Sequence, residues 1–99
     1  MEKKKHRPKT WREGLHERLQ NPKYAEAYIL GAMKEGLDLE IALKDVIAAV
    51  GVARYSRKVK GLERPNVYKF VGKGRNPTLR TIRRLLEPLG LDIGVVKMA

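Results

Sequence analysis

The sequence predicts a mainly α-helical protein with one short β-strand near its C-terminus. Apolar residues recur at the i, i+3, i+4, i+7 spacing of a helix face, and Asn-Pro, Asp and Gly residues stand where such helices would begin and end. Alternation of Leu91, Ile93 and Val95 predicts the strand. With 99 residues, 42% apolar and 33% charged, the chain can form one compact domain.

Residues 1–13, MEKKKHRPKTWRE, form a basic stretch with little apolar content. We expect a disordered arm there, because such a segment buries too little apolar surface to offset the entropy of folding. The single domain then spans residues 14–99.

Two amphipathic helices follow the arm. Asn21-Pro22 is typical of an N-cap followed by Pro at the first helical position, and Gly36 ends that helix. Asp38 can cap a second helix that ends at Gly51. The first helix has one apolar face, made of Ala25, Tyr28, Ile29, Ala32 and Met33. The second has a wider apolar stripe, made of Leu39, Ala42, Leu43, Val46, Ile47 and Val50, which predicts that it is the central helix of the core.

Two short helices are expected next, at 52–59 (VARYSRKV) and 63–71 (ERPNVYKFV), joined by a turn at Gly61. Their lengths and the glycine between them are typical of a helix-turn-helix. Apolar residues would face inward, and helical geometry then leaves a polar face outward. The inward set is Leu62, Val67, Phe70 and Val71, and the outward set is Glu63, Arg64, Asn66, Lys69 and Lys73, with Tyr68 at its edge.

A second Asn-Pro pair, Asn76-Pro77, predicts the start of a last helix. Its expected buried stripe is Leu79, Ile82, Leu85, Leu86 and Leu89, while Arg80, Arg83 and Arg84 point away. Pro88 should loosen its last turn and Gly90 should end it. The strand over 91–96 needs a partner, so Leu91, Ile93 and Val95 are candidates for a homodimer interface; packing on the chain's own domain is the alternative.

Charge and composition narrow the function. Residues 1–20 carry +4, residues 21–51 carry −2 and residues 52–99 carry +9, so the positive charge belongs to the C-terminal half and favours a polyanionic partner. The absence of cysteine excludes thiolate catalysis and Cys-based zinc sites, and agrees with a reducing cytoplasm. No nucleophile, base and orienting group form a set, so we expect no enzyme, no cofactor and no metal site.

Double-stranded DNA is the expected polyanion, because an α-helix fits its major groove. The base-reading candidates are Glu63, Arg64, Asn66, Tyr68 and Lys69. Phosphate contacts would come from cations and from a helix N-terminus, namely Arg54, Arg57, Lys58, Lys73, Arg75 and Thr78.

With these segments in this order, the chain resembles the HigA-like addiction-module antidote proteins, which are antitoxins with a lambda-repressor-like helix-turn-helix. The resemblance runs from about Leu15 to Val96, through LQNPKYAEAYILGAMKEG, ALKDVIAAVG, GLERPNVYKFVGKGRNPTLRTI and LGL. It implies a five- to six-helix domain that binds its own operator as a dimer, represses its operon and neutralises a RelE/ParE-like toxin. The acidic segment would face that toxin, with Glu26, Glu35, Asp38 and Glu40 as candidates.

The chain departs from the family pattern before its turn. Counting back from Gly61, Arg57 stands where relatives place a small residue, whereas Ser56 fits if one residue is inserted. Two other functions stay open. One is a basic RNA- or ribosome-associated protein that clamps phosphates by shape, and the other is a phage-type repressor without a toxin partner.

Overall fold

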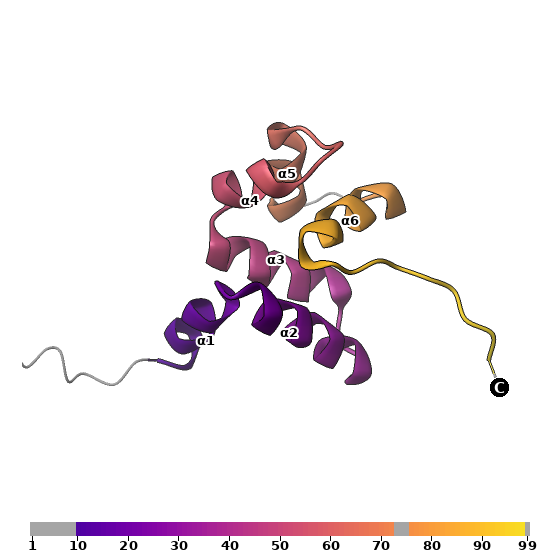
Figure 1. The fold of residues 1–99 in the computed structure, drawn as a ribbon, viewed down its shortest axis with the longest axis horizontal. Helices are drawn as coiled ribbons and strands as arrows, with labels where there is room; N and C mark the ends of the chain where they lie inside the picture. The colour runs from indigo at the N-terminus through magenta and orange to yellow at the C-terminus, as the bar shows by residue number, and fades with distance from the viewer. Residues whose placement is uncertain (1–9, 73–75, 99) are drawn as a thin grey trace, which may run out of the picture.

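The computed structural model describes residues 10–72 and 76–98, and these contain six α-helices and one 3₁₀ helix (Figure 1). Their bounds are α1 Trp11–Leu19, α2 Pro22–Lys34, α3 Leu39–Val50, α4 Val52–Lys58, α5 Arg64–Val71, α6 Leu79–Leu86 and η2 Glu87–Leu89. The mainly helical class is therefore as the sequence predicts. Within the described ranges no helix is long and apolar enough to cross a membrane.

Helix α1 begins three residues before the expected domain boundary at residue 14. Thr10 and Glu13 form a capping box: the Thr10 hydroxyl accepts from the Glu13 backbone N–H at 3.1 Å, and the Glu13 carboxylate accepts from that of Thr10 at 3.0 Å. This reciprocal pair fixes the start of the helix. Residues 1–9 of the expected arm lie outside the described residues.

Helix α3 lies at the centre of the molecule and packs on α1, α2, α4, α5 and α6. Leu43, Val46 and Ile47 are completely buried, as their stripe predicts. The caps of α2 and α3 are also confirmed, because the side chain of Asn21 accepts from Lys23 N–H and that of Asp38 accepts from Glu40 N–H. Local sequence signals thus fix this half of the domain.

Helices α4 and α5 pack on each other and are joined by residues 59–63. Gly61 turns the chain with φ of +77°, a conformation that side chains other than glycine rarely adopt. Ser56 is buried and donates to the Ala53 carbonyl at 2.8 Å, whereas Arg57 is exposed. The small buried residue of α4 is therefore Ser56, the position that fits if one residue is inserted before Gly61.

The last helix begins later than the Asn76-Pro77 pair predicts. Thr78 is its N-cap, and its hydroxyl accepts from the Thr81 backbone N–H at 3.1 Å. Asn76 and Pro77 therefore precede α6 rather than opening it, and Leu79 at the first helical position is 59% exposed instead of buried. Pro88 does end the α-helix, because the chain continues as the 3₁₀ turn η2 up to Gly90.

The predicted C-terminal β-strand is wrong: no strand occurs in 10–72 or 76–98, and residues 91–98 are extended without a ladder (Figure 1). Arg83 holds the segment instead, with its guanidinium 2.8 and 2.9 Å from the two carboxylate oxygens of Asp92. Leu91 and Ile93 are half-buried against the chain's own core. Val95, the third dimer candidate, is 99% exposed. None of the described residues forms a strand beside this segment, so its backbone has no ladder to join.

Candidate nucleic-acid interface

Helix α5 separates its apolar and polar side chains by face. Val67 and Phe70 are buried in the core, at 0% and 5% exposure. All five residues that the sequence predicts to read bases are exposed along the opposite side and the N-terminal end, namely Glu63, Arg64, Asn66, Tyr68 and Lys69. The structure therefore brings this set together on one short helix. Glu63 is the N-cap, so the positive end of the helix dipole lies next to Arg64 and Asn66.

Contacts with α3 and α6 fix the positions of α5 and of α4, which packs on it. The Lys44 ammonium of α3 lies 5.6 Å from the centre of the Phe70 ring, a distance typical of a cation–π contact. Tyr55 of α4 donates its buried hydroxyl to the Leu85 carbonyl of α6 at 2.6 Å. Burial raises the pKa of Tyr55 well above its ordinary value, so its hydroxyl keeps its proton. These contacts position α5 without using its polar face.

Of the six predicted phosphate contacts, three are exposed cations on α4: Arg54, Arg57 and Lys58. Lys73 and Arg75 lie outside the described residues. Thr78 is exposed and its hydroxyl is already used as the cap of α6. A phosphate at this helix start would therefore be bound mainly by backbone N–H groups.

A hollow of about 250 Å³ lies between α5 and the start of α6. Asn66 and Lys69 line it from α5, and Asn76 and Thr78 line it from the other side. Two groups predicted for different tasks, base reading and phosphate binding, thus lie around one opening. Nothing in the sequence marks Asn76 as a lining residue, because an Asn-Pro pair predicts only a helix start.

Arg84 was expected to point into solvent, but it lies against the turn between α4 and α5. A Cβ atom added to Gly61 would come within 3.0 Å of the Arg84 Nε, and the other side of the guanidinium is 3.3 Å from a carboxylate oxygen of Glu87. This residue therefore supports the turn. The signal for it was indirect, since only the glycine shows that something approaches closely.

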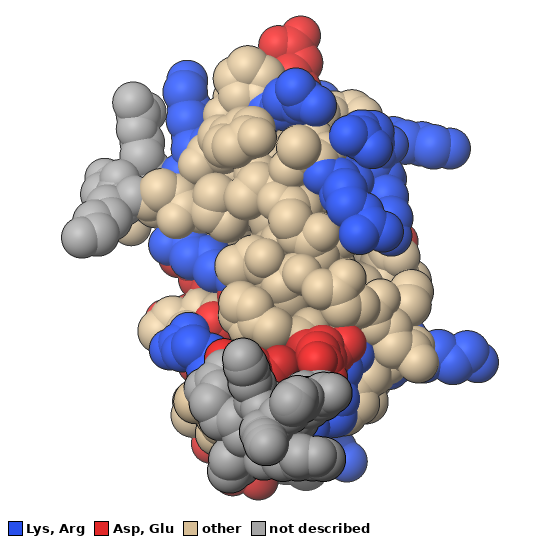
Figure 2. Space-filling model, turned by 90° about the vertical axis from the view of Figure 1, so that its left-hand side faces the viewer, with Lys and Arg blue, Asp and Glu red and all other residues tan. Residues whose placement is uncertain are grey.

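Charge is unevenly distributed over the surface. Figure 2 shows Lys and Arg side chains gathered most densely at the upper right, toward the end of the molecule that carries α4 and α5 in Figure 1. Most acidic side chains on this face lie lower, although acidic atoms also stand at its top edge. This distribution agrees with the strong positive charge of residues 52–99.

The four acidic candidates for a protein partner do not share one site. Glu35 and Asp38 line a groove between α2 and α3, where Asp38 also caps α3. Glu40 is paired with Lys44 at 3.1 Å, and Glu26 is half-buried on α2. Among the described residues, no three His, Cys, Asp or Glu side chains form a cluster that could hold a metal ion.

Comparison with known protein families gives a match over most of the chain. The model of a family described as "Probable addiction module antidote protein" matches residues 13–97. Neither the curated proteins nor the solved structures gave a match.

Proposed function

The chain belongs to the family of probable addiction module antidote proteins, and we propose that it is an antitoxin that also represses its own operon by binding operator DNA. Membership of this family implies a toxin partner of some kind. In more detail, we propose that the toxin is RelE/ParE-like, that the antitoxin binds the operator as a homodimer and that it is cytoplasmic. Its action consists of binding and involves no catalysis.

The observation that carries the DNA proposal is the division of α5 into a buried apolar face and an exposed polar one. An α-helix fits the major groove of B-DNA, and the N-terminal residues of such a helix usually contact base edges. Arg64 would pair with the O6 and N7 atoms of guanine, Asn66 with adenine, and Glu63 would accept from the amino group of cytosine. Tyr68 and Lys69 would contact the neighbouring DNA strand.

The residues around α5 supply the sequence-independent part of binding. Arg54, Arg57 and Lys58 on α4 would neutralise phosphates on one side of the groove. The start of α6 would bind a phosphate on the other side, next to the hollow lined by Asn66, Lys69 and Thr78. Lys73 and Arg75, which follow α5 and precede α6 in the sequence, belong to the same proposal as further cations.

A homodimer is proposed because one eight-residue helix makes too few contacts for tight operator binding. Two copies spaced one helical turn apart on a palindrome bind far more tightly than one. Leu91 and Ile93 pack on their own domain, so of the three predicted interface residues only Val95 remains free enough to serve in it.

The decisive experiment is fluorescence anisotropy of the purified protein with the duplex immediately upstream of its own gene, over a salt series. Scrambled duplex and an unrelated RNA serve as competitors. We expect binding that survives both competitors, with log affinity falling by about 0.9 per phosphate neutralised for each unit of log salt. Equal binding to all three nucleic acids would contradict operator reading and would support an RNA- or phosphate-clamping protein instead.

A further inference from the structure

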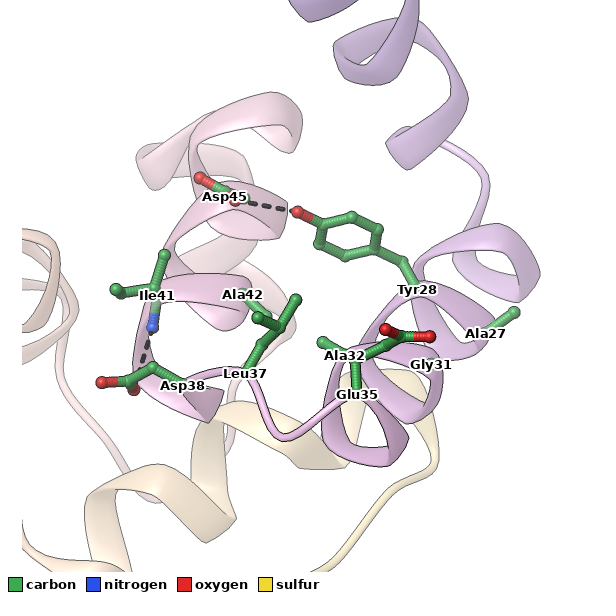
Figure 3. A pocket seen from close by; sticks show the side chains of 10 residues that line it. All are labelled: Ala27, Tyr28, Gly31, Ala32, Glu35, Leu37, Asp38, Ile41, Ala42 and Asp45. Carbon is green, nitrogen blue, oxygen red and sulfur yellow. Dashed lines mark hydrogen bonds between the residues drawn. The ribbon is translucent and has the colours of Figure 1, made fainter.

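Helices α2 and α3 and the link between them enclose an open groove of about 390 Å³ (Figure 3). Its walls are mainly apolar. Leu37 in the link and Ile41 on α3 are 62% and 61% exposed, although both are large aliphatic side chains. On α2 the wall is low, because Ala27 and Gly31 carry almost no side chain there.

The two exposed aliphatic side chains of the groove, Leu37 and Ile41, lie around one opening. Apolar side chains that gather around a groove, rather than singly over a surface, are typical of sites that bind another protein. Leu30 and Met33 are also exposed on α2, but they do not line the groove.

The groove is bordered by carboxylates. Glu35, Asp38 and Asp45 line it, and none of its lining residues is Lys or Arg. Asp45 accepts from the Tyr28 hydroxyl at 2.9 Å, as Figure 3 shows. Burial, and then this hydrogen bond, raise the pKa of Tyr28 to about 12. The tyrosine hydroxyl therefore stays protonated, donates the hydrogen bond to Asp45 and adds no charge.

The nearest lysine of α3 is turned away from this border. Lys44 pairs with Glu40 and lies over the Phe70 ring of α5, so it does not neutralise the carboxylates of the groove. An apolar floor with an acidic border suits a partner that presents apolar side chains flanked by Lys or Arg. A basic partner bound to this groove would also be kept from residues 52–99, whose net charge of +9 would repel it.

We propose that this α2–α3 groove is the toxin-binding surface, and that the toxin fills it with a basic amphipathic segment. The inference rests on the proposed antitoxin role and adds to it the site and the chemistry of the partner. Aliphatic side chains of the segment lie on Leu37 and Ile41, and its cations lie beside Glu35 and Asp38. Glu26 and Glu40, two of the four acidic residues expected to face a toxin, lie outside this contact.

The test uses the full chain and the small protein encoded by the reading frame next to its gene, with affinity measured by calorimetry. Ile41→Lys puts a charge into the groove at an exposed position. Gly31→Leu fills the groove instead, and a Cβ at residue 31 meets no atom within 4 Å, so a side chain can leave the backbone there without a clash at its first atom. Leu79→Lys on α6 is the matched control, because Leu79 is equally exposed at 59% and does not line the groove.

We expect Ile41→Lys and Gly31→Leu each to weaken toxin binding at least tenfold, and Leu79→Lys to change it less than twofold. All three should keep the helical circular-dichroism spectrum. Tight binding of the wild type together with unchanged binding of both groove variants would overturn the groove and leave the antitoxin role standing. No binding by the wild type would overturn the antitoxin role itself, and the groove assignment with it.

A second copy of the chain is the competing occupant, since Val95, Val96 and Met98 are exposed apolar residues of an extended tail. Sedimentation of the same variants, with Val95→Lys added, separates the two. If Ile41→Lys and Val95→Lys both abolish self-association while toxin binding is kept, the groove holds the tail of another copy and the proposal is wrong.

Discussion

Neighbouring residues of α5 have opposite tasks, which makes single substitutions informative. Asn66 is exposed beside the fully buried Val67, and Lys69 is exposed beside the buried Phe70. A change at an outward residue should therefore affect binding, and a change at an inward residue should affect folding. The same separation allows stability and recognition to be measured in separate variants.

Arg64→Ala should weaken binding to the upstream duplex by about 5- to 150-fold, the effect of losing one bidentate base contact of about 1–3 kcal/mol. Binding to scrambled duplex should change much less. Lys34→Ala, an equal loss of charge at an exposed site on α2, is the control. If the two variants lose affinity equally for both duplexes, Arg64 contributes charge and no base reading.

Tyr55→Phe should lower the free energy of unfolding by about 1–3 kcal/mol, because the buried Leu85 carbonyl loses its donor. Urea denaturation followed by circular dichroism measures this loss. Tyr68→Phe removes a hydroxyl from a side chain that is 47% exposed and should leave stability within about 0.5 kcal/mol of the wild type. A Tyr55→Phe variant as stable as the Tyr68→Phe control would contradict the role of this hydrogen bond.

Most outward and inward residues of α5 could be predicted from the sequence, because they follow from helical periodicity alone. The positions of Arg84 and Leu79 could not. Arg84 lies against Gly61, which is distant in sequence, and the exposure of Leu79 depends on where α6 begins. Thr78 rather than Asn76 caps that helix, and both residue types are good caps, so the sequence did not distinguish them.

At the scale of elements, the turn between α4 and α5 combines two constraints at Gly61: a positive φ and the guanidinium of Arg84. Gly36 has the same φ of +77° but no atom near its missing Cβ. Comparison of the two glycines therefore separates backbone strain from the close contact.

Gly36→Ala should cost about 1 kcal/mol through backbone strain alone, whereas Gly61→Ala should cost more because Arg84 must also move. Gly61→Ala should in addition weaken operator binding by displacing α5. Urea unfolding and anisotropy of both variants measure these effects. Equal stability losses, with operator binding intact in both, would mean that Arg84 yields freely and does not support the turn.

The C-terminal segment is held by an ion pair whose strength depends on pH. The Arg83 guanidinium, and then the Ile93 backbone N–H, lower the pKa of Asp92. A carboxyl whose pKa is lower in the folded state stabilises the fold at any pH above its ordinary pKa. It loses this contribution as the pH falls through the ordinary pKa and then the lowered one. The contact should therefore be complete at neutral pH and lost in acid.

Methyl NMR signals of Ile93 should accordingly shift as the pH falls below about 4, the ordinary range of an aspartate pKa. Asp92→Asn should show the acid-like signals already at pH 7 and should not respond further. Signals that move identically in the wild type and in Asp92→Asn would show that another group holds the segment.

The helices were predictable because caps and apolar periodicity are local signals. The fate of residues 91–96 was not, because alternation describes only which residues share a face, while a strand needs a neighbour to complete its hydrogen bonds. Leu91 and Ile93 satisfied the same pattern by packing on the core, with Asp92 between them held by Arg83.

At the scale of the whole molecule, α5 lies at one end and α2 at the other, with α3 between them (Figure 1). The charge runs the same way, since residues 21–51 carry −2 and residues 52–99 carry +9. This polarity could be read from the sequence. The groove could not, because it depends on how the small residues of α2 pack opposite Leu37 and Ile41.

The protein should therefore bind operator and toxin at the same time. Adding the protein from the neighbouring frame to a preformed operator complex should give a larger complex in a gel-shift experiment, without release of DNA. Ile41→Lys should bind DNA normally but give no larger complex. Release of DNA by the wild type on addition of that protein would contradict the separation of the two surfaces.

Helix α3 joins the two surfaces within one turn. Asp45 holds Tyr28 in the wall of the groove, while the adjacent Lys44 lies over Phe70 beneath α5. A lineage that adapts to a new toxin therefore cannot change this turn freely, because the operator-reading helix rests on it. Adaptation is easier at Leu37 and Ile41, near the start of α3, where a substitution alters the groove and leaves the support of α5 intact.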